Sequence, residues 1–324
     1  MNSVPSFEKV NYAIRPNKNV ERKLIFECLG GLGQHFDLSQ YTYIGLGSMW
    51  FIDFILAHKR LLIKDMVSIE KELDAESRAN FNRPYCCIKV EPGETTIVLP
   101  SLLLDEKHSI IWLDHDSDLK GTVLRDIEII CEKAKSGCIF IVTLNANVRQ
   151  VKDVKNKEGK RLADEEALRY FVGGLAPEPM PKDALSKEKF PQILGKILID
   201  HMKRSPRIAG TDKKFVPIFN FYYRDTAPMI TVGGMLANQA DAEKLSRCQL
   251  SEKYDYIRGE TQYHIAVPHL TPKEKFGIDQ LLPSPRSLSA KDIEDNLGFS
   301  LKDEHIKAYC KFYRFYPMFG EIAY

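Results

Sequence analysis

The chain has 324 residues, of which 44% are hydrophobic and 28% charged, enough for one large domain or one domain with sizeable additions. Its formal net charge of +2 provides no global field that would draw it onto nucleic acid or an anionic membrane. No apolar run approaches the roughly 20 residues that cross a bilayer, and the N-terminus lacks the apolar core of a secretion signal. We therefore expect a cytoplasmic protein without a membrane span, whose seven cysteines are mostly buried, reduced thiols.

The first predicted helix covers residues 19–36. Asn19 can cap it, and apolar residues recur along one side at helical spacing. A compact polar stretch that includes Arg15 and Lys18 precedes this helix.

Between residues 41 and 144, short apolar runs alternate with helical patterns. The runs are continuous rather than alternating, which is typical of parallel strands covered on both faces. Their short connections indicate βαβ units and a doubly wound sheet. Strands are expected at 41–46, 65–70, 86–90, 109–113 and 138–144, with helices at 47–59, 72–81, 94–104 and 122–134.

Regularity then lapses over residues 148–183, which are polar, basic and interrupted by prolines, as in an insertion or lid. A helix is expected at 183–202, and two strands at 216–223 and 229–235 should form an antiparallel hairpin. A helix at 241–250, an edge strand at 261–267 and helical additions from residue 271 complete the chain.

These elements predict an α/β fold with a doubly wound, mostly parallel seven-stranded sheet that ends in an antiparallel hairpin, together with an insertion and C-terminal helical additions. We divide the chain into an N-terminal segment and helix (1–37), a Rossmann-like cofactor-binding domain (38–147 and 211–267), an insertion or lid (148–210) and a C-terminal helical extension (268–324).

Residues suited to a nucleotide pocket follow four of the predicted strands. The first strand leads into a glycine turn, the second ends in an acid, and the third and fourth are each followed by one. Because ligands bind at the carboxyl edge of such sheets, these residues should gather there. Each alone has an ordinary explanation, as a tight turn or a helix-start charge, but their conjunction favours a binding site. The residues are Gly45, Gly47, Ser48, Glu70, Glu94 and Asp114.

The segments YIGLGS, SIEKE, VEPGET, WLDHDSD and IVTLN together resemble the sequential motifs of class I methyltransferases that use S-adenosylmethionine, including an O-methyltransferase branch of that superfamily. The resemblance covers roughly residues 38–145. It implies that the Gly45–Gly47 turn lies beneath the methionine part of the cofactor, that Glu70 holds the ribose and that Glu94 faces the adenine amino group. Asp114 would then lie near the methionine amine or the acceptor.

Two positions depart from this family pattern. Tyr43 stands where the family usually has an acid, and Met49 stands where it often has a third glycine. Asp53 or Asp114 could replace the missing acid in space. Many methyltransferases fold an N-terminal segment over the cofactor, so Arg15 or Lys18 could meet the cofactor carboxylate, although both could equally be solvated residues before a helix.

His115 is the strongest candidate for a general base, because the unperturbed pKa of histidine, roughly 6.5, suits proton removal near neutrality. We assign the catalytic role to Asp114 and His115. The acidic run around them could hold a hard cation, but it lacks the pattern of a calcium loop, and we expect no obligate metal. Asn145 and Asn147 could contact an acceptor or could serve as ordinary turn residues.

The sequence therefore predicts a methyltransferase with S-adenosylmethionine as its cofactor. The acceptor is open, as O- or N-methylation of a small molecule, a protein or RNA. Basic clusters at 152–161 and 203–214 favour RNA, whereas interspersed acids and the near-neutral net charge disfavour it. The departures at Tyr43 and Met49 keep a non-catalytic nucleotide-binding module as the alternative. A nicotinamide dehydrogenase is disfavoured because Trp50 stands where its fingerprint has a glycine.

Overall fold

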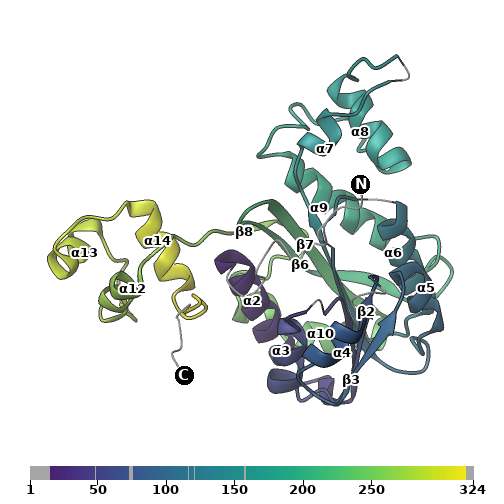
Figure 1. Cartoon of the computed structure of the whole chain (residues 1–324), viewed down its shortest axis with the longest axis horizontal. Helices are drawn as coiled ribbons and strands as arrows, with labels where there is room; N and C mark the ends of the chain where they lie inside the picture. The colour runs from purple at the N-terminus through teal and green to yellow at the C-terminus, as the bar shows by residue number, and fades with distance from the viewer. Residues whose placement is uncertain are drawn as a thin grey trace.

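The computed structural model describes residues 15–318, with the exception of residues 48, 73–75, 116, 120 and 157. A twisted eight-stranded sheet runs through the molecule, with helices on both of its faces (Figure 1). The described chain alternates strand and helix as far as β5 and later adds an antiparallel hairpin. This is the doubly wound α/β architecture that the apolar strand pattern predicts.

The strand order in the sheet is β3-β2-β1-β4-β5-β7-β6-β8. The first five strands are mutually parallel, whereas β7 lies antiparallel between β5 and β6, which confirms the predicted hairpin. The sheet has eight strands rather than seven because the predicted edge strand pairs in parallel with β6. The strands are β1 Thr42–Gly45, β2 Asp65–Glu70, β3 Ile88–Pro92, β4 Ser109–Asp114, β5 Cys138–Asn145, β6 Lys214–Arg224, β7 Pro228–Ala237 and β8 Tyr263–Ile265.

The carboxyl edge of the sheet has a recess at β1. Gly45, the last residue of β1, pairs with Ser68 of β2 and with Trp112 of β4. Both neighbouring strands continue two residues further, to Glu70 and Asp114. The turn after β1 therefore lies between two longer strands, at the point where the chain order reverses direction across the sheet.

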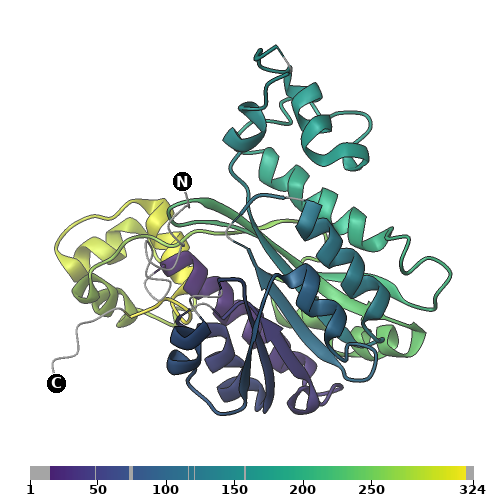
Figure 2. The ribbon, with the colours of Figure 1, turned by 45° about the vertical axis from the view of Figure 1, so that its right-hand side comes forward.

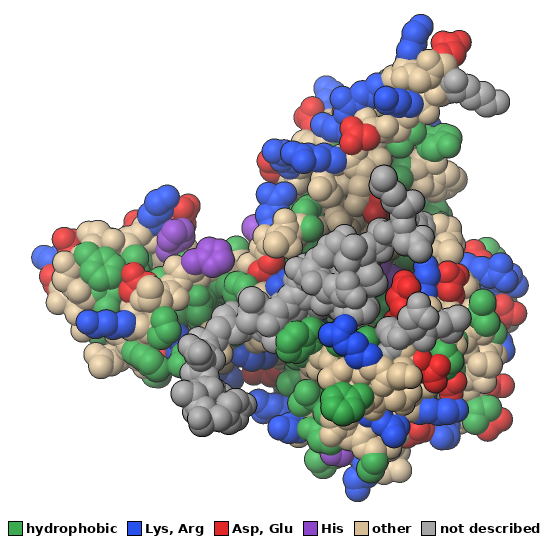
Figure 3. Space-filling view, in the orientation of Figure 1, with side chains coloured by type: hydrophobic (Ala, Val, Ile, Leu, Met, Phe, Trp, Pro, Cys, Tyr) green, Lys and Arg blue, Asp and Glu red, His purple; other side chains and the backbone are tan. Residues whose placement is uncertain are grey.

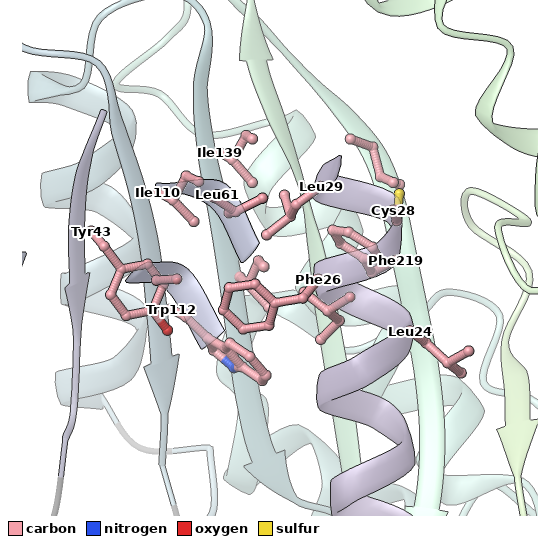
Figure 4. Close-up of a cluster of buried hydrophobic side chains, with 14 of the residues drawn as sticks. Leu24, Phe26, Cys28, Leu29, Tyr43, Leu61, Ile110, Trp112, Ile139 and Phe219 are labelled. Carbon is pink, nitrogen blue, oxygen red and sulfur yellow. The ribbon is translucent and has the colours of Figure 1, made fainter. Parts of the chain in front are cut away.

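One face of the sheet is covered by α2 Pro16–Leu32 and α3 Ile52–Leu61, together with α10 Gln239–Arg247 and α11 Leu250–Lys253. Figure 4 shows how apolar side chains of α2, among them Phe26 and Leu29, point at Trp112 and Ile110 on the sheet. All four of these residues are at most 4% exposed. By burying these rings and aliphatic chains together, the packing fixes α2 against the sheet.

The starts of the first two helices on this face, α2 and α3, differ from the prediction. The first helix begins at Pro16 rather than at Asn19, because proline is well suited to the first turn, and it ends at Leu32. Helix α3 begins at Ile52 rather than directly after the glycine turn. Phe51 precedes it in a left-handed conformation, and its N–H donates to the Gly47 carbonyl, so an extra turn separates β1 from the helix.

The other face is covered mainly by α6 Gly121–Lys133 and α9 Phe190–Lys203, with the short α5 Thr95–Val98 and η4 Leu99–Ser101 beside them. The predicted helix at 94–104 is therefore broken after one turn, where Pro100 leads into the 3-10 segment. The predicted helix at 183–202 begins only at Phe190. Helix α4, Glu76–Asn82, lies beside β3.

The segment between β5 and α9 carries two further helices, α7 Arg149–Lys152 and α8 Asp164–Val172, followed by η5 Gly173–Leu175. It projects from the carboxyl edge of the sheet, at the top of Figure 1 and Figure 2. Its base is anchored, since Val151, Leu168 and Val172 are at most 4% exposed and join the core of the α9 face.

The C-terminal residues form three helices, α12 Pro272–Asp279, α13 Ala290–Leu297 and α14 Asp303–Phe312. They enclose a separate small core built on Ile278, Ile293, Ile306 and Tyr309. In the described part of the chain, no helix is long and apolar enough to span a bilayer.

Candidate active site

The turn after β1 is tightly packed. The Gly47 N–H donates to the Ser68 hydroxyl at 3.1 Å. A Cβ added at Gly47 would lie 2.5 Å from that same oxygen and 2.7 Å from the Phe51 ring. A side chain therefore has no room here, which is a packing reason for the second glycine of the turn. Ser48, also assigned to the pocket from the sequence, lies outside the described residues.

Tyr43 occupies the place of the acid that the family pattern leads us to expect, and the structure supplies an acid beside it. The Tyr43 hydroxyl donates to Asp53 at 2.7 Å, and both side chains are buried. The Asp53 carboxylate lies 3.3 Å from the point where a Cβ of Gly45 would stand. Of the two replacements considered from the sequence, Asp53 is thus the one that borders the glycine turn.

Glu70 and Glu94 lie on neighbouring turns beyond the ends of β2 and β3. The Gly93 N–H donates to the Glu70 carbonyl at 2.8 Å, so the two turns are joined through the backbone. The Glu70 side chain accepts the Glu72 N–H at 3.2 Å, and burial raises its pKa. Glu94 is half-exposed and forms an ion pair with Lys71 at 3.2 Å.

Asp114 belongs to a buried charge cluster that α2 completes. Its carboxylate lies 2.9 Å from the Lys18 ammonium and 4.0 Å from the Arg22 guanidinium. Lys18 in turn lies 2.8 Å from Glu21, and neither side chain is exposed. Burial acts to raise the pKa of Asp114, but the positive charges of Lys18 and Arg22 outweigh it and lower that pKa below its usual value.

A chain of hydrogen bonds connects this cluster to the sheet. The Trp112 indole N–H donates to Thr143 at 3.0 Å, Thr143 and Thr231 share a bond of 2.8 Å, and Thr231 donates to Glu21. Burial raises the pKa of Glu21, and the adjacent Lys18 charge acts against that rise. The polar groups at the centre of the sheet are thus satisfied by α2.

The Tyr223 hydroxyl, near the end of β6, is buried and makes no hydrogen bond within the described part of the chain. Its ring centroid lies 5.5 Å from the Lys18 ammonium, and burial raises the pKa of this hydroxyl well above its usual value. The group is therefore a protonated donor that remains available for a ligand or a water molecule.

His115 faces the opposite side of the sheet from Asp114, because consecutive residues of a strand alternate between faces. Its Nε2 lies 3.8 Å from Asp126 of α6, which also accepts the Thr95 hydroxyl at 2.5 Å. Burial raises the pKa of Asp126 to about 6. The two predicted catalytic residues are adjacent in sequence, but they therefore lie in different surroundings.

Arg15 directly precedes α2 and lies close enough for its charge to act on Asp114. The N-terminus of α2 is capped by Asp225, which accepts the backbone N–H groups of Asn17 and Lys18, each at 3.0 Å. Arg15 and the first turn of α2 thus lie at the carboxyl edge, beside the ends of β4 and β6.

The remaining sequence candidates have structural roles or fall outside the described residues. The Asn145 side chain accepts the Asn147 N–H at 2.9 Å, and Asn147 accepts the Arg149 N–H at 3.1 Å, as in ordinary turns. Within the described ranges, no group of three or more histidine, cysteine, aspartate or glutamate residues could hold a metal ion. Asp116, in the middle of the acidic run, is not among the described residues.

A cavity of about 430 Å³ opens beside the buried charge cluster of Lys18 and Asp114. Its walls are residues 146–149 after β5, the turn between β6 and β7, and Lys187 before α9. Lys and Arg side chains, with acids between them, also gather on the projecting α7–α8 segment above it (Figure 3).

Sequence reasoning noted Lys18 only in the polar stretch before the helix, and it missed Glu21, Arg22 and Tyr223. Lys18, Glu21 and Arg22 stand at spacings of three and four residues, which places them on one side of a helix. That signal was present, but a helix expected to begin at Asn19 excluded Lys18. Tyr223 gave no signal beyond its place in an apolar strand.

The sequence model of a family described as "Putative O-methyltransferase" matches residues 10–324. A search of curated protein sequences gave no match.

Among solved structures, the chain is similar to Trm1 from Pyrococcus horikoshii in complex with S-adenosyl-L-methionine, at 13% identity and a TM-score of 0.44, over 71% of this chain and 58% of that one. It is also similar to a "putative O-methyltransferase" from Klebsiella pneumoniae, at 15% identity and a TM-score of 0.37, over 68% and 90% of the two chains. A "putative S-adenosylmethionine dependent methyltransferase" from Listeria monocytogenes has 11% identity and a TM-score of 0.35, over 65% and 99%.

Proposed function

We propose that this chain, which belongs to the family described as "Putative O-methyltransferase", transfers a methyl group from S-adenosylmethionine to an acceptor. The observation that carries the proposal is the family match over residues 10–324. It is supported by the strand order, in which the glycine turn and the acids of β2 and β4 meet at one edge.

The residues at this edge have the chemistry that S-adenosylmethionine requires. A carboxylate offers about four acceptor positions, and the Glu70 side chain uses only part of them on backbone N–H groups, which leaves lone pairs for two ribose hydroxyls. Glu94, on the adjoining turn, could accept the adenine amino group. The tight Gly45–Gly47 turn would lie beneath the methionine part.

The charged groups near α2 suit the amino-acid end of the cofactor. Asp114, kept ionised by Lys18 and Arg22, can attract an ammonium group, and Arg15 can bind a carboxylate. The buried Tyr223 hydroxyl is a further donor toward the cofactor or the acceptor.

When bound, S-adenosylmethionine supplies an electrophilic methyl group. The work left to the protein is alignment of the acceptor and, for a hydroxyl or amine acceptor, proton removal. We assign proton removal to His115, because the Asp126 carboxylate lies 3.8 Å from its Nε2 and can stabilise the imidazolium that forms. Asp114 would act on the other side, by holding the donor or the acceptor.

The direct test is calorimetry with S-adenosylmethionine, its demethylated product, NAD and ATP, each titrated separately. We expect binding of the first two and none of NAD. Preferential binding of NAD or ATP would refute the assignment. Once an acceptor is available, Asp114→Asn should lower turnover far more than Asp118→Asn, which lies further along the loop. His115→Ala should lower the rate roughly 10²–10⁴-fold if the residue is a general base.

Two observations favour a non-catalytic binding module as the second candidate. Tyr43 replaces the usual acid, and Asp114 already has the Lys18 ammonium as a partner at 2.9 Å. Binding of S-adenosylmethionine without methyl transfer to any acceptor pool would support this candidate over the enzyme.

A further inference from the structure

The cavity beside the site is lined by three cationic residues from three separate segments. Arg149 begins α7, Arg224 ends β6, and Lys187 precedes α9. None of the three forms an ion pair with another residue in the described part of the chain. This convergence differs from the α8 surface, where Arg169 is paired with Glu165 and Glu178.

Asp225, the one acid among the described residues of the cavity wall, is already engaged. Both carboxylate oxygens of Asp225 accept backbone N–H groups from the start of α2, and one of them also accepts the Asn17 side chain at 3.1 Å. Its negative charge is therefore opposed by the positive end of the helix dipole. Glu188 follows Lys187 in the chain but does not line the cavity. The described lining therefore carries three cationic residues against one acid, a net positive formal charge.

Hydrogen bonds between separate elements fix the backbone that forms the cavity walls. The Ala146 N–H donates to the Pro228 carbonyl at 2.8 Å, which joins the end of β5 to the start of β7. The Asn17 side chain donates to the Arg224 carbonyl at 2.9 Å, which joins the end of β6 to α2. Since Lys18 of the same turn contacts Asp114, the cavity adjoins the charge cluster at the end of β4.

We propose that the methyl acceptor is a small molecule with an anionic group, a carboxylate or a phosphate, which Arg149, Lys187 and Arg224 bind in this cavity. The inference rests on the proposed methyltransferase function and specifies its substrate class. A volume of about 430 Å³ is that of a small-molecule pocket. Guanidinium groups bind the planar or tetrahedral oxygens of such anions through paired N–H donors.

The test uses inorganic phosphate and acetate as separate probes, titrated into the full-length protein by calorimetry. The cavity variant carries Arg149→Ala, Lys187→Ala and Arg224→Ala. The control carries Lys155→Ala, Lys182→Ala and Arg204→Ala, which removes the same charge from exposed positions outside the cavity. We expect the cavity variant to bind the preferred anion roughly tenfold or more weakly, and the control to match the unmodified protein.

Phosphate preferred over acetate would point to a phosphate-bearing acceptor, and the reverse to a carboxylate. Equal anion affinity in the unmodified protein and the cavity variant would overturn the proposal. A short single-stranded RNA that binds tightly and is weakened equally in both triple variants would overturn it in favour of an RNA acceptor.

S-adenosylmethionine affinity, measured in the same three proteins, separates this inference from the proposed function. Unchanged cofactor binding with lost anion binding supports both. A protein that binds the anion in the cavity but never binds S-adenosylmethionine refutes the methyltransferase function and, with it, the acceptor role of the anion. Loss of cofactor affinity in the cavity variant alone would assign the three cations to the cofactor carboxylate and overturn the proposal.

Discussion

Lys18→Met should destabilise the fold strongly. The Lys18 ammonium is fully buried between the carboxylates of Glu21 and Asp114, at 2.8 and 2.9 Å, and lies 4.9 Å from the centroid of the Trp112 ring. At an effective dielectric constant of roughly 20, two unit charges 4 Å apart interact by about 4 kcal/mol, although desolvation offsets much of this. Breaking a buried ion pair from one side costs about 3–5 kcal/mol.

The loss should depend on pH, since Glu21 can become neutral. Burial already raises the pKa of Glu21 in the folded state, and the Lys18 charge opposes that rise. Without Lys18 the pKa should rise further, so the folded state takes up a proton more readily than the unfolded chain. The deficit in free energy of unfolding is therefore smallest below the unfolded pKa of Glu21 and grows as pH rises toward neutrality.

Urea unfolding of the unmodified protein, Lys18→Met and Lys18→Met/Glu21→Gln at pH 4 to 7 measures both effects. The double variant should recover part of the stability, because it removes one uncompensated charge. Lys23→Met, on the same helix, is the control and should cost about 1 kcal/mol, the loss of one hydrogen bond to the Phe315 carbonyl. A loss below 1 kcal/mol in Lys18→Met, or one that does not change with pH, would refute the reasoning.

Four further changes test other parts of the structure. Glu70→Ala should weaken S-adenosylmethionine binding by roughly 1–3 kcal/mol, by calorimetry, because ribose hydroxyls would lose a buried acceptor. Gly47→Ala should destabilise the protein by about 1–3 kcal/mol in thermal or urea unfolding, because the new methyl group would overlap the buried side chains of Ser68 and Phe51. Gly30→Ala, in the last turn of α2, where a Cβ meets nothing within 4 Å, should instead stabilise it by about 0.5–1 kcal/mol. Asp126→Asn should flatten the pH dependence of the free energy of unfolding between pH 4 and 6. In the folded protein the pKa of Asp126 is about 6, against the usual 3.8, so the buried carboxylate reduces stability as pH rises through that window.

Each of these has a contrary result. Unchanged cofactor affinity would remove Glu70 from the binding site. Similar effects of the two glycine substitutions would mean that packing does not explain Gly47. An unaltered pH profile in Asp126→Asn would show that another group titrates in that range.

Much of the architecture follows from local sequence. The continuous apolar runs at 109–113 and 138–144 can be covered only when both faces of the sheet are packed, so they predict parallel strands. The turn residues between 216–223 and 229–235 predict the antiparallel hairpin, and the structure contains it. The placement of Glu70, Glu94 and Asp114 after successive strands also follows, since the carboxyl ends of parallel strands share one edge.

The charge environment of the site was decided only by tertiary structure. Lys18 meets Asp114 across nearly 100 residues of chain, and Asp225 caps a helix more than 200 residues before it. Local periodicity carries no information about such contacts, because they depend on where α2 packs on the sheet. For the same reason the sequence predicted an acid beside the glycine turn without choosing between Asp53 and Asp114, and gave no sign that Arg149, Lys187 and Arg224 line one cavity.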